Sequence, residues 1–276
     1  MLKQRVITAV ILVIGFLALL FSTSALHFSL AIAPVVLLAG WEWTNLMQLE
    51  TKAKKAAFLL LLAVALLVSG LILNLSAELD MQLGQLMVLA ASILWAVIFL
   101  WIQGYPSSAI LWSPRPVLGL LGLLLLAFTW IAIVLIVHQP HGAWLLLFAV
   151  VIVALADIGG YIAGNLFGKH KLAATVSPGK TWEGFFGGIL LQCLLIAAMI
   201  PLMPQKITPV ILVALVIPVS LYSVLGDLFE SMVKRHCGVK DSGTILPGHG
   251  GILDRIDGLI AALPLFILLF LLLNPL

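Results

Sequence analysis

The chain has 276 residues, of which 63% are hydrophobic and only 9% are charged. Because an average soluble domain is about 25% charged, this composition excludes an ordinary water-soluble enzyme. The net charge of +3 is too small to indicate a nucleic-acid partner, and the two cysteines form no CxxC pair that would indicate a structural zinc site.

Apolar runs recur along the whole sequence, and each is long enough, or nearly so, to cross about 30 Å of hydrocarbon. They predict an all-α, polytopic membrane protein with about nine transmembrane helices. We expect a single membrane domain over 1–276, in which 1–140 is mainly a hydrophobic helical scaffold and 141–276 carries the catalytic helices and cytoplasmic loops. The predicted spans are 6–21, 26–46, 57–75, 84–103, 117–137, 143–165, 183–203, 208–229 and 254–273.

The basic residues favour keeping the first run as a span. The alternative is a signal peptide, for which Lys3, Arg5 and the later "STSA" provide only a weak pattern. With nine spans and a cytoplasmic N-terminus, 13 of the 14 Lys and Arg residues fall on the cytoplasmic side, and only Lys206 falls outside. We therefore expect a multi-pass protein of the cell (inner) membrane, whose long polar segments 165–183 and 230–253 face the cytoplasm.

Two isolated carboxylates lie in or beside these apolar runs. Glu42, in "GWEWTN", is predicted to lie at the membrane interface with Trp41 and Trp43. Asp157 interrupts the sixth span, where a lone carboxylate is costly and is usually functional. Two interpretations stay open for Asp157: it joins a metal or substrate site, or it pairs structurally with Lys180.

The end of the sixth span is rich in glycine. Gly160, Gly164 and Gly168 recur at every fourth residue, so one face of the helix is bare backbone. This spacing predicts close packing of another helix.

The stretch "SPGKTWEG" at 177–184 is similar to the end of a P-loop. Ala174 stands where that pattern requires a glycine, and we expect no strand before it, which excludes a Walker-type nucleotide fold. Ser177, Lys180 and Thr181 nevertheless offer hydroxyls and a positive charge to a phosphate at the start of the seventh span. Glu183 in the first turn simply favours the helix dipole.

The densest polar stretch, Gly226 to Asp257, carries nine of the chain's 25 charged residues. Asp227 lies at the inner end of the eighth span and Asp254 begins the ninth. Because consecutive helices are usually neighbours, we expect these two carboxylates to meet near the cytoplasmic interface. Hard oxygen ligands without cysteine suit Mg²⁺, which also relieves the repulsion between the acids. The alternative is a structural salt-bridge cluster with Lys234, Arg235 and Arg255.

The loop between these spans contains "PGHGG" at 247–251. Glycines let the backbone approach a phosphate, and the following helix N-terminus attracts anions. The alternative for such a turn is mere chain reversal, but basic residues lie on both sides of it. His249 is a candidate phosphate ligand or general acid, or a hydrogen-bonding residue that only positions others. The basic residues available to a polyphosphate are Lys234, Arg235, Lys240 and Arg255.

From Ser231 to Asp257 the chain reads "SMVKRHCGVKDSGTILPGHGGILDRID". This stretch closely resembles the signature of phosphatidate cytidylyltransferases, also called CDP-diacylglycerol synthases. The resemblance implies a nucleotidyltransferase of phospholipid biosynthesis that converts CTP and phosphatidic acid to CDP-diacylglycerol and pyrophosphate with Mg²⁺. It implies CTP, phosphatidic acid and membrane lipids as partners, and it leaves open a second cation and a homodimer.

On this interpretation, Asp227 and Asp254 hold the metal, and the other polar residues bind or orient the substrates. The expected catalytic residues are Asp227, Asp254, Lys234, Arg235, Asp157 and His249. The expected substrate-binding residues are Ser177, Lys180, Thr181, Lys240, Asp241, Gly250, Gly251, Arg255 and Asp257.

Two other functions use similar residues. A CTP-dependent lipid or polyprenol kinase would use the same phosphate chemistry on a hydroxyl acceptor. An ion transporter would use the aspartates as an ion path, but here the charges cluster at one predicted interface rather than across the bilayer.

Overall fold

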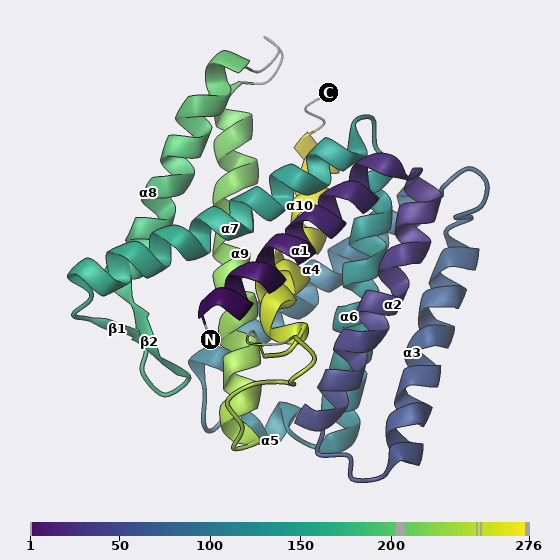
Figure 1. Ribbon diagram of the computed structural model, residues 1–276, viewed down its shortest axis with the longest axis horizontal. Helices are drawn as coiled ribbons and strands as arrows, with labels where there is room; N and C mark the ends of the chain where they lie inside the picture. The colour runs from purple at the N-terminus through teal and green to yellow at the C-terminus, as the bar shows by residue number, and fades with distance from the viewer. Residues whose placement is uncertain (1, 203–207, 247, 249, 274–276) are drawn as a thin grey trace. The chain divides into compact units, whose positions relative to one another are not determined.

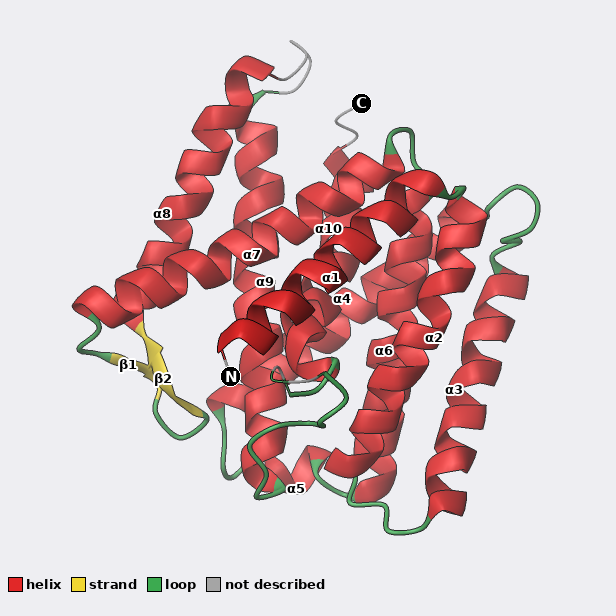
Figure 2. Ribbon diagram, in the orientation of Figure 1, coloured by secondary structure: helices red, strands yellow, loops and turns green. Residues whose placement is uncertain are grey.

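The computed structural model of the protein describes residues 2–202, 208–246, 248 and 250–273, and most of them are helical (Figures 1 and 2). The chain forms two compact units. The first contains Met1–Gly84, Ile110–Leu146 and Val233–Ile256, and the second contains Gln85–Ala109, Leu147–Met232 and Asp257–Leu276. Each unit is therefore built from segments that are far apart in the sequence.

Within the described residues most helices follow one another with short connections, apart from the β-hairpin before α8 and the long loop between α9 and α10. The helices are α1 (Leu2–Ser22), α2 (Ala25–Leu46), α3 (Lys52–Ile72), α4 (Met81–Gln103), α5 (Ala109–Trp112), α6 (Arg115–Val137), α7 (Gly142–Phe167), α8 (Trp182–Met199), the 3₁₀ turn η1 (Ile200–Leu202), α9 (Pro209–His236) and α10 (Leu253–Leu273). The strands are β1 (Lys171–Ala173) and β2 (Ser177–Thr181).

Eight of these helices are long and apolar enough to cross a membrane: α2, α3, α4, α6, α7, α8 with η1, α9 and α10. Over its described side chains, α1 adds a shorter apolar helix, Val6–Ser22. A helix therefore stands at each of the nine predicted spans, and the prediction of a polytopic, all-α membrane protein is confirmed. The side of the membrane on which each loop lies stays a prediction.

Two helix boundaries differ from the prediction for local reasons. α3 begins at Lys52 rather than near 57, because the Thr51 hydroxyl accepts a hydrogen bond from the Lys54 amide at 3.3 Å and caps the helix. α9 continues beyond 229 to His236, so its last turn is basic. Positive side chains are favourable there because they oppose the negative end of the helix dipole.

In the first unit, α2, α3 and α6 pack side by side (Figure 1). Their buried tryptophans are tied to backbone carbonyls. Trp43 Nε1 donates to the Leu118 oxygen and Trp130 Nε1 donates to the Ser29 oxygen, both at 2.9 Å. Surroundings without water make an unpaired indole N–H costly, so these bonds fix the relative position of α2 and α6.

In the second unit, α7 and α8 meet along a seam of glycines. A Cβ atom added at Gly184 would lie 2.7 Å from the Gly160 oxygen, and one added at Gly159 would lie 2.6 Å from the Gly187 oxygen. The predicted close helix contact is confirmed for Gly160 and Gly164, whereas Gly168 follows the end of α7.

We expect Gly159→Ala to lower the free energy of unfolding by about 1–3 kcal/mol, because the new methyl group meets backbone that cannot move aside easily. Thermal unfolding in detergent would measure the change. Gly15→Ala is the matched control, since a Cβ there meets nothing within 4 Å. Equal melting temperatures for the two variants would contradict a tight seam.

Candidate active site

The hairpin leads directly into a membrane helix. β1 and β2 are antiparallel, with Lys171 opposite Thr181, and α8 begins at the residue after β2. The expectation of no strand before "GKT" is therefore wrong. The strand is nevertheless part of a short antiparallel hairpin, and Lys180 lies within β2, so the arrangement differs from a P-loop, whose lysine follows a glycine-rich loop.

Thr181 ends β2 and caps α8. Its Oγ1 accepts a hydrogen bond from the Gly184 amide at 3.1 Å, and the residue is buried. This bond satisfies one of the amides left without a partner at a helix start. A structural role thus accounts for the threonine, which the sequence assigned to a phosphate. Glu183 accepts from the Lys169 and His170 amides at 3.1 and 3.2 Å and thereby fixes the start of the hairpin.

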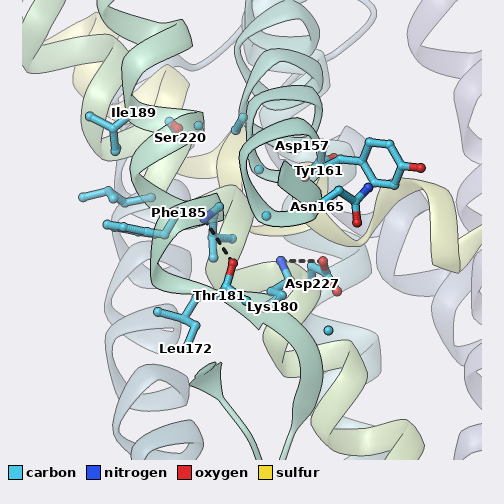
Figure 3. Close-up of a pocket in the computed structure, with 18 residues that line it drawn as sticks. Asp157, Tyr161, Asn165, Leu172, Lys180, Thr181, Phe185, Ile189, Ser220 and Asp227 are labelled. Atoms are coloured by element: carbon cyan, nitrogen blue, oxygen red, sulfur yellow. Dashed lines mark hydrogen bonds and ion pairs between the residues drawn. The ribbon is translucent and has the colours of Figure 1, made fainter. Parts of the chain in front are cut away.

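Lys180 pairs with Asp227 across the second unit. Lys180 Nζ lies 2.6 Å from Asp227 Oδ2 (Figure 3). The Ser231 hydroxyl donates to Asp227 Oδ1 at 3.2 Å. This ion pair joins β2 to α9. Asp157, on α7, lines the same cavity and also feels the charge of Lys180, so both interpretations of Asp157 stay open.

This cavity has a volume of about 320 Å³ and lies between α7, α8, α9 and the hairpin (Figure 3). Two carboxyl groups and one ammonium group line it, and Lys180 offsets the charge of Asp227. The carboxyl oxygens can coordinate a cation, and the one lysine can contact an anion that enters with it. The polar lining residues are Asp157, Asn165, Lys180, Thr181, Ser220 and Asp227.

In the first unit, Asp254 is held by several donors at once. Lys234 Nζ lies 2.7 Å from Oδ1, and the Asp254 side chain is only 6% exposed. The Ser242 amide approaches both carboxylate oxygens, at 3.2 and 3.1 Å, and the Gly251 amide donates to Oδ2 at 2.9 Å. The Lys234–Asp254 ion pair agrees with the alternative interpretation, in which the acids and basic residues form a structural salt-bridge cluster.

The glycine-rich loop wraps around this carboxylate. Gly250 has a φ of +84°, a backbone conformation that favours glycine, and a Cβ there would lie 3.0 Å from Asp254 Oδ2. The Gly251 amide, which the sequence assigned to a phosphate, donates to Asp254 instead. These glycines thus place an aspartate, and their direct contact with substrate stays a prediction.

The other predicted residues lie at or near the protein surface. Asp257 is half-buried and accepts a hydrogen bond from the next amide, Gly258, at 2.7 Å. Ser177 is half-buried in β2. His249 lies outside the described residues. The exposed members of the set are Arg235, Lys240, Asp241 and Arg255.

The carboxylates fit magnesium by their chemistry. No group of three or more His, Cys, Asp or Glu forms a metal site within the described residues, but Mg²⁺ commonly uses only one or two carboxylates, with water and substrate phosphates. Since a carboxylate offers about four acceptor positions, Asp227 has room beside its two donors, whereas Asp254 would have to release one. That the two share one ion stays a prediction, because they belong to different units.

Sequence reasoning missed two residues beside Asp254. Ser242 is 2% exposed and Glu42 is 0% exposed. The position of Glu42 at the membrane interface stays a prediction. The signal for Glu42 was present, since it is an acid within an apolar span. Ser242 carried no signal, because a serine in a polar loop is ordinary.

A polytopic helical membrane protein whose cavity is lined by one lysine and two carboxyl groups, with a further lysine–carboxylate pair in the other unit, has the features of an enzyme that handles phosphate. The sequence profile of the cytidylyltransferase family matches residues 3–273. The chain therefore belongs to this family of nucleotidyltransferases.

Relatives are similar over nearly the whole chain. A phosphatidate cytidylyltransferase of Haemophilus influenzae is 38% identical, covering 96% of this chain and 97% of that protein. One of Pseudomonas aeruginosa is 40% identical, covering 96% of each. One of Staphylococcus epidermidis is 51% identical over 127 residues, which are 46% of this chain and 49% of that protein.

We expect Thr181→Val to lower the free energy of unfolding by about 1 kcal/mol, because it removes the cap hydroxyl and keeps the side-chain shape. Thr181→Ser retains the hydroxyl and should unfold like the wild type. Thermal unfolding of both variants measures the difference. A valine variant as stable as the serine variant would show that the cap hydrogen bond does not stabilise the protein.

We expect Lys234→Met to destabilise the protein by about 3–5 kcal/mol, because it leaves the buried Asp254 carboxylate without its cation. Adding Asp254→Asn to that variant should recover much of the loss. A double-mutant cycle by thermal or denaturant unfolding measures the coupling. Additive effects of the two changes would contradict the pair.

Proposed function

We propose that the protein transfers the cytidylyl group of CTP to phosphatidic acid, giving CDP-diacylglycerol and pyrophosphate. The observation that carries the proposal is the similarity over nearly the full chain to two proteins named phosphatidate cytidylyltransferase. The signature from Ser231 to Asp257 and the grouping of phosphate-compatible residues support it.

In this reaction an oxygen of the lipid phosphate attacks the α-phosphorus of CTP. The bond from that phosphorus to the bridging oxygen of the β-phosphate breaks, and pyrophosphate leaves with the bonding electrons. The lipid phosphate is itself the nucleophile, so no protein nucleophile is needed. The protein has to position two anions and neutralise the charge that develops between them.

Lys180 suits this task because it borders the cavity on a strand that runs straight into α8. Its ion pair with Asp227 holds the ammonium group in place before an anion arrives. Arg235, Lys240 and Arg255 are exposed and are proposed to bind the triphosphate and the departing pyrophosphate.

Asp227 and Asp254 are the proposed Mg²⁺ ligands, with Asp157 and Asp257 orienting the site. The ion, when bound, would stabilise negative charge on the reacting phosphates. We further propose that the site faces the cytoplasm, since CTP is water-soluble and the basic loops are predicted to lie there.

The test is incubation of the purified protein with CTP, phosphatidic acid and Mg²⁺, scoring pyrophosphate and CDP-lipid with each component omitted in turn. A phosphorylated lipid plus CDP would indicate a lipid kinase instead. Ion uptake into vesicles without CTP would indicate a transporter. Either result in place of CDP-lipid overturns the proposal.

We expect Asp227→Asn to reduce turnover to below about one hundredth of the wild type, because even the outer partners of metal ligands contribute about 10- to 100-fold. Expression and folding should persist, since an amide still accepts from Ser231. Glu78→Gln, at an exposed glutamate, is the isosteric control and should retain activity. Turnover like the wild type in the Asp227 variant would refute the metal assignment.

A further inference from the structure

Glu42 is a buried carboxylate that belongs to the first unit and lies on α2. Its exposure is 0%. Its Oε2 accepts a hydrogen bond from the amide of Leu253, the first residue of α10, at 2.8 Å, and a weaker one from the Ser242 hydroxyl at 3.4 Å. A negative charge at a helix start is favourable because the helix dipole is positive there. Glu42 therefore holds the beginning of α10 from a different helix.

The same loop residue connects Glu42 to Asp254. Ser242 directs its hydroxyl to Glu42 and its amide to both oxygens of Asp254. Leu253, which donates to Glu42, directly precedes Asp254 in the chain. Two separate contacts thus transmit the position of one carboxylate to the other.

The loop is shaped closely around the Glu42 side chain. A Cβ atom added at Gly251 would lie 2.5 Å from Glu42 Oε2, and one at Gly243 would lie 2.7 Å from the Glu42 carboxyl carbon. Only glycine fits at these two positions while the carboxylate stays in place. The loop backbone therefore packs directly against the Glu42 carboxylate.

Stability alone does not explain this arrangement. Among the described residues, Glu42 Oε1 is buried and has no hydrogen-bond partner. A buried, incompletely paired carboxylate costs free energy, and a neutral side chain could fill the space at lower cost. An unpaired buried group of this kind needs another reason to be there.

We infer that Glu42 is a positioning residue that orients the Asp254 carboxylate for cation binding, through Ser242 and the first turn of α10. The inference rests on the proposed function, in which Asp254 is a metal ligand. It assigns a part in the site to the hydrophobic N-terminal half, which the sequence treats as scaffold.

The first experiment needs no activity. Hydrogen–deuterium exchange of the full-length protein in detergent compares Glu42→Gln, Glu42→Ala and the exposed control Glu50→Gln with the wild type. We expect faster exchange in peptides covering 240–256 for both Glu42 variants, more for alanine than for glutamine. Exchange in α3 and α6, and the behaviour of the control, should match the wild type.

The second experiment measures the Mg²⁺ concentration that gives half-maximal CDP-lipid formation. We expect it to rise about tenfold in Glu42→Ala, as for other outer partners of metal ligands, and severalfold in Glu42→Gln. The KM for phosphatidic acid should change by less than about twofold, because Glu42 is not among the residues that line the cavity beside Lys180 and Asp227. Glu50→Gln should keep both values.

The outcomes separate the inference from the proposed function. If the wild type makes no CDP-lipid, the proposed function fails, and unchanged exchange at 240–256 would independently remove the inference. Faster exchange with an unchanged Mg²⁺ requirement would make Glu42 a purely structural cap and overturn the inference. If neither Glu42 variant folds, Ser242→Ala removes only the hydroxyl link, and its Mg²⁺ requirement must rise for the inference to stand.

Discussion

An ionised side chain removed from water must find an opposite charge or several hydrogen bonds, and this constraint organises the protein. Asp227 is matched by Lys180, and Asp254 by Lys234 together with two backbone amides. In a chain this apolar, each such match is expensive to assemble and to lose. These ion pairs offset the cost of burying charged groups in the folded chain. They also hold the carboxylates and ammonium groups in fixed positions, which is what phosphate chemistry requires.

Backbone packing places these pairs. Because α7 and α8 approach through glycines, the hairpin between them is held against α9, where Lys180 meets Asp227. In the first unit, tryptophan-to-carbonyl bonds join α2 to α6, and α2 carries Glu42 to the loop around Asp254. Contacts made by residues outside the candidate site therefore help to determine where the site residues lie.

The sequence was sufficient for the features that depend on composition and spacing. Apolar runs predicted a helix at each of nine places, and the four-residue glycine spacing predicted the contact of α7 with α8. It was insufficient where the partner comes from a distant segment. The sequence indicated only Asp157 as a possible partner of Lys180, and the folded chain shows an ion pair with Asp227. The "GHGG" loop suggested a phosphate by composition, whereas the folded loop directs an amide to Asp254.

The junction of β2 with α8 has a consequence for how this chain tolerates changes in length. The strand ends at Thr181 and the helix begins at Trp182, with no loop between them. An α-helix rises 1.5 Å and turns about 100° per residue. One inserted residue at the junction would therefore change both the position of Lys180 along the α8 axis and its direction around that axis. In the turn between the two strands, Ala174 and Thr175 are exposed whereas Val176 is buried, so added residues fit best at 174–175. Insertions and deletions among homologous chains should accumulate in that turn and avoid the junction, because the junction fixes the position of Lys180 relative to α8.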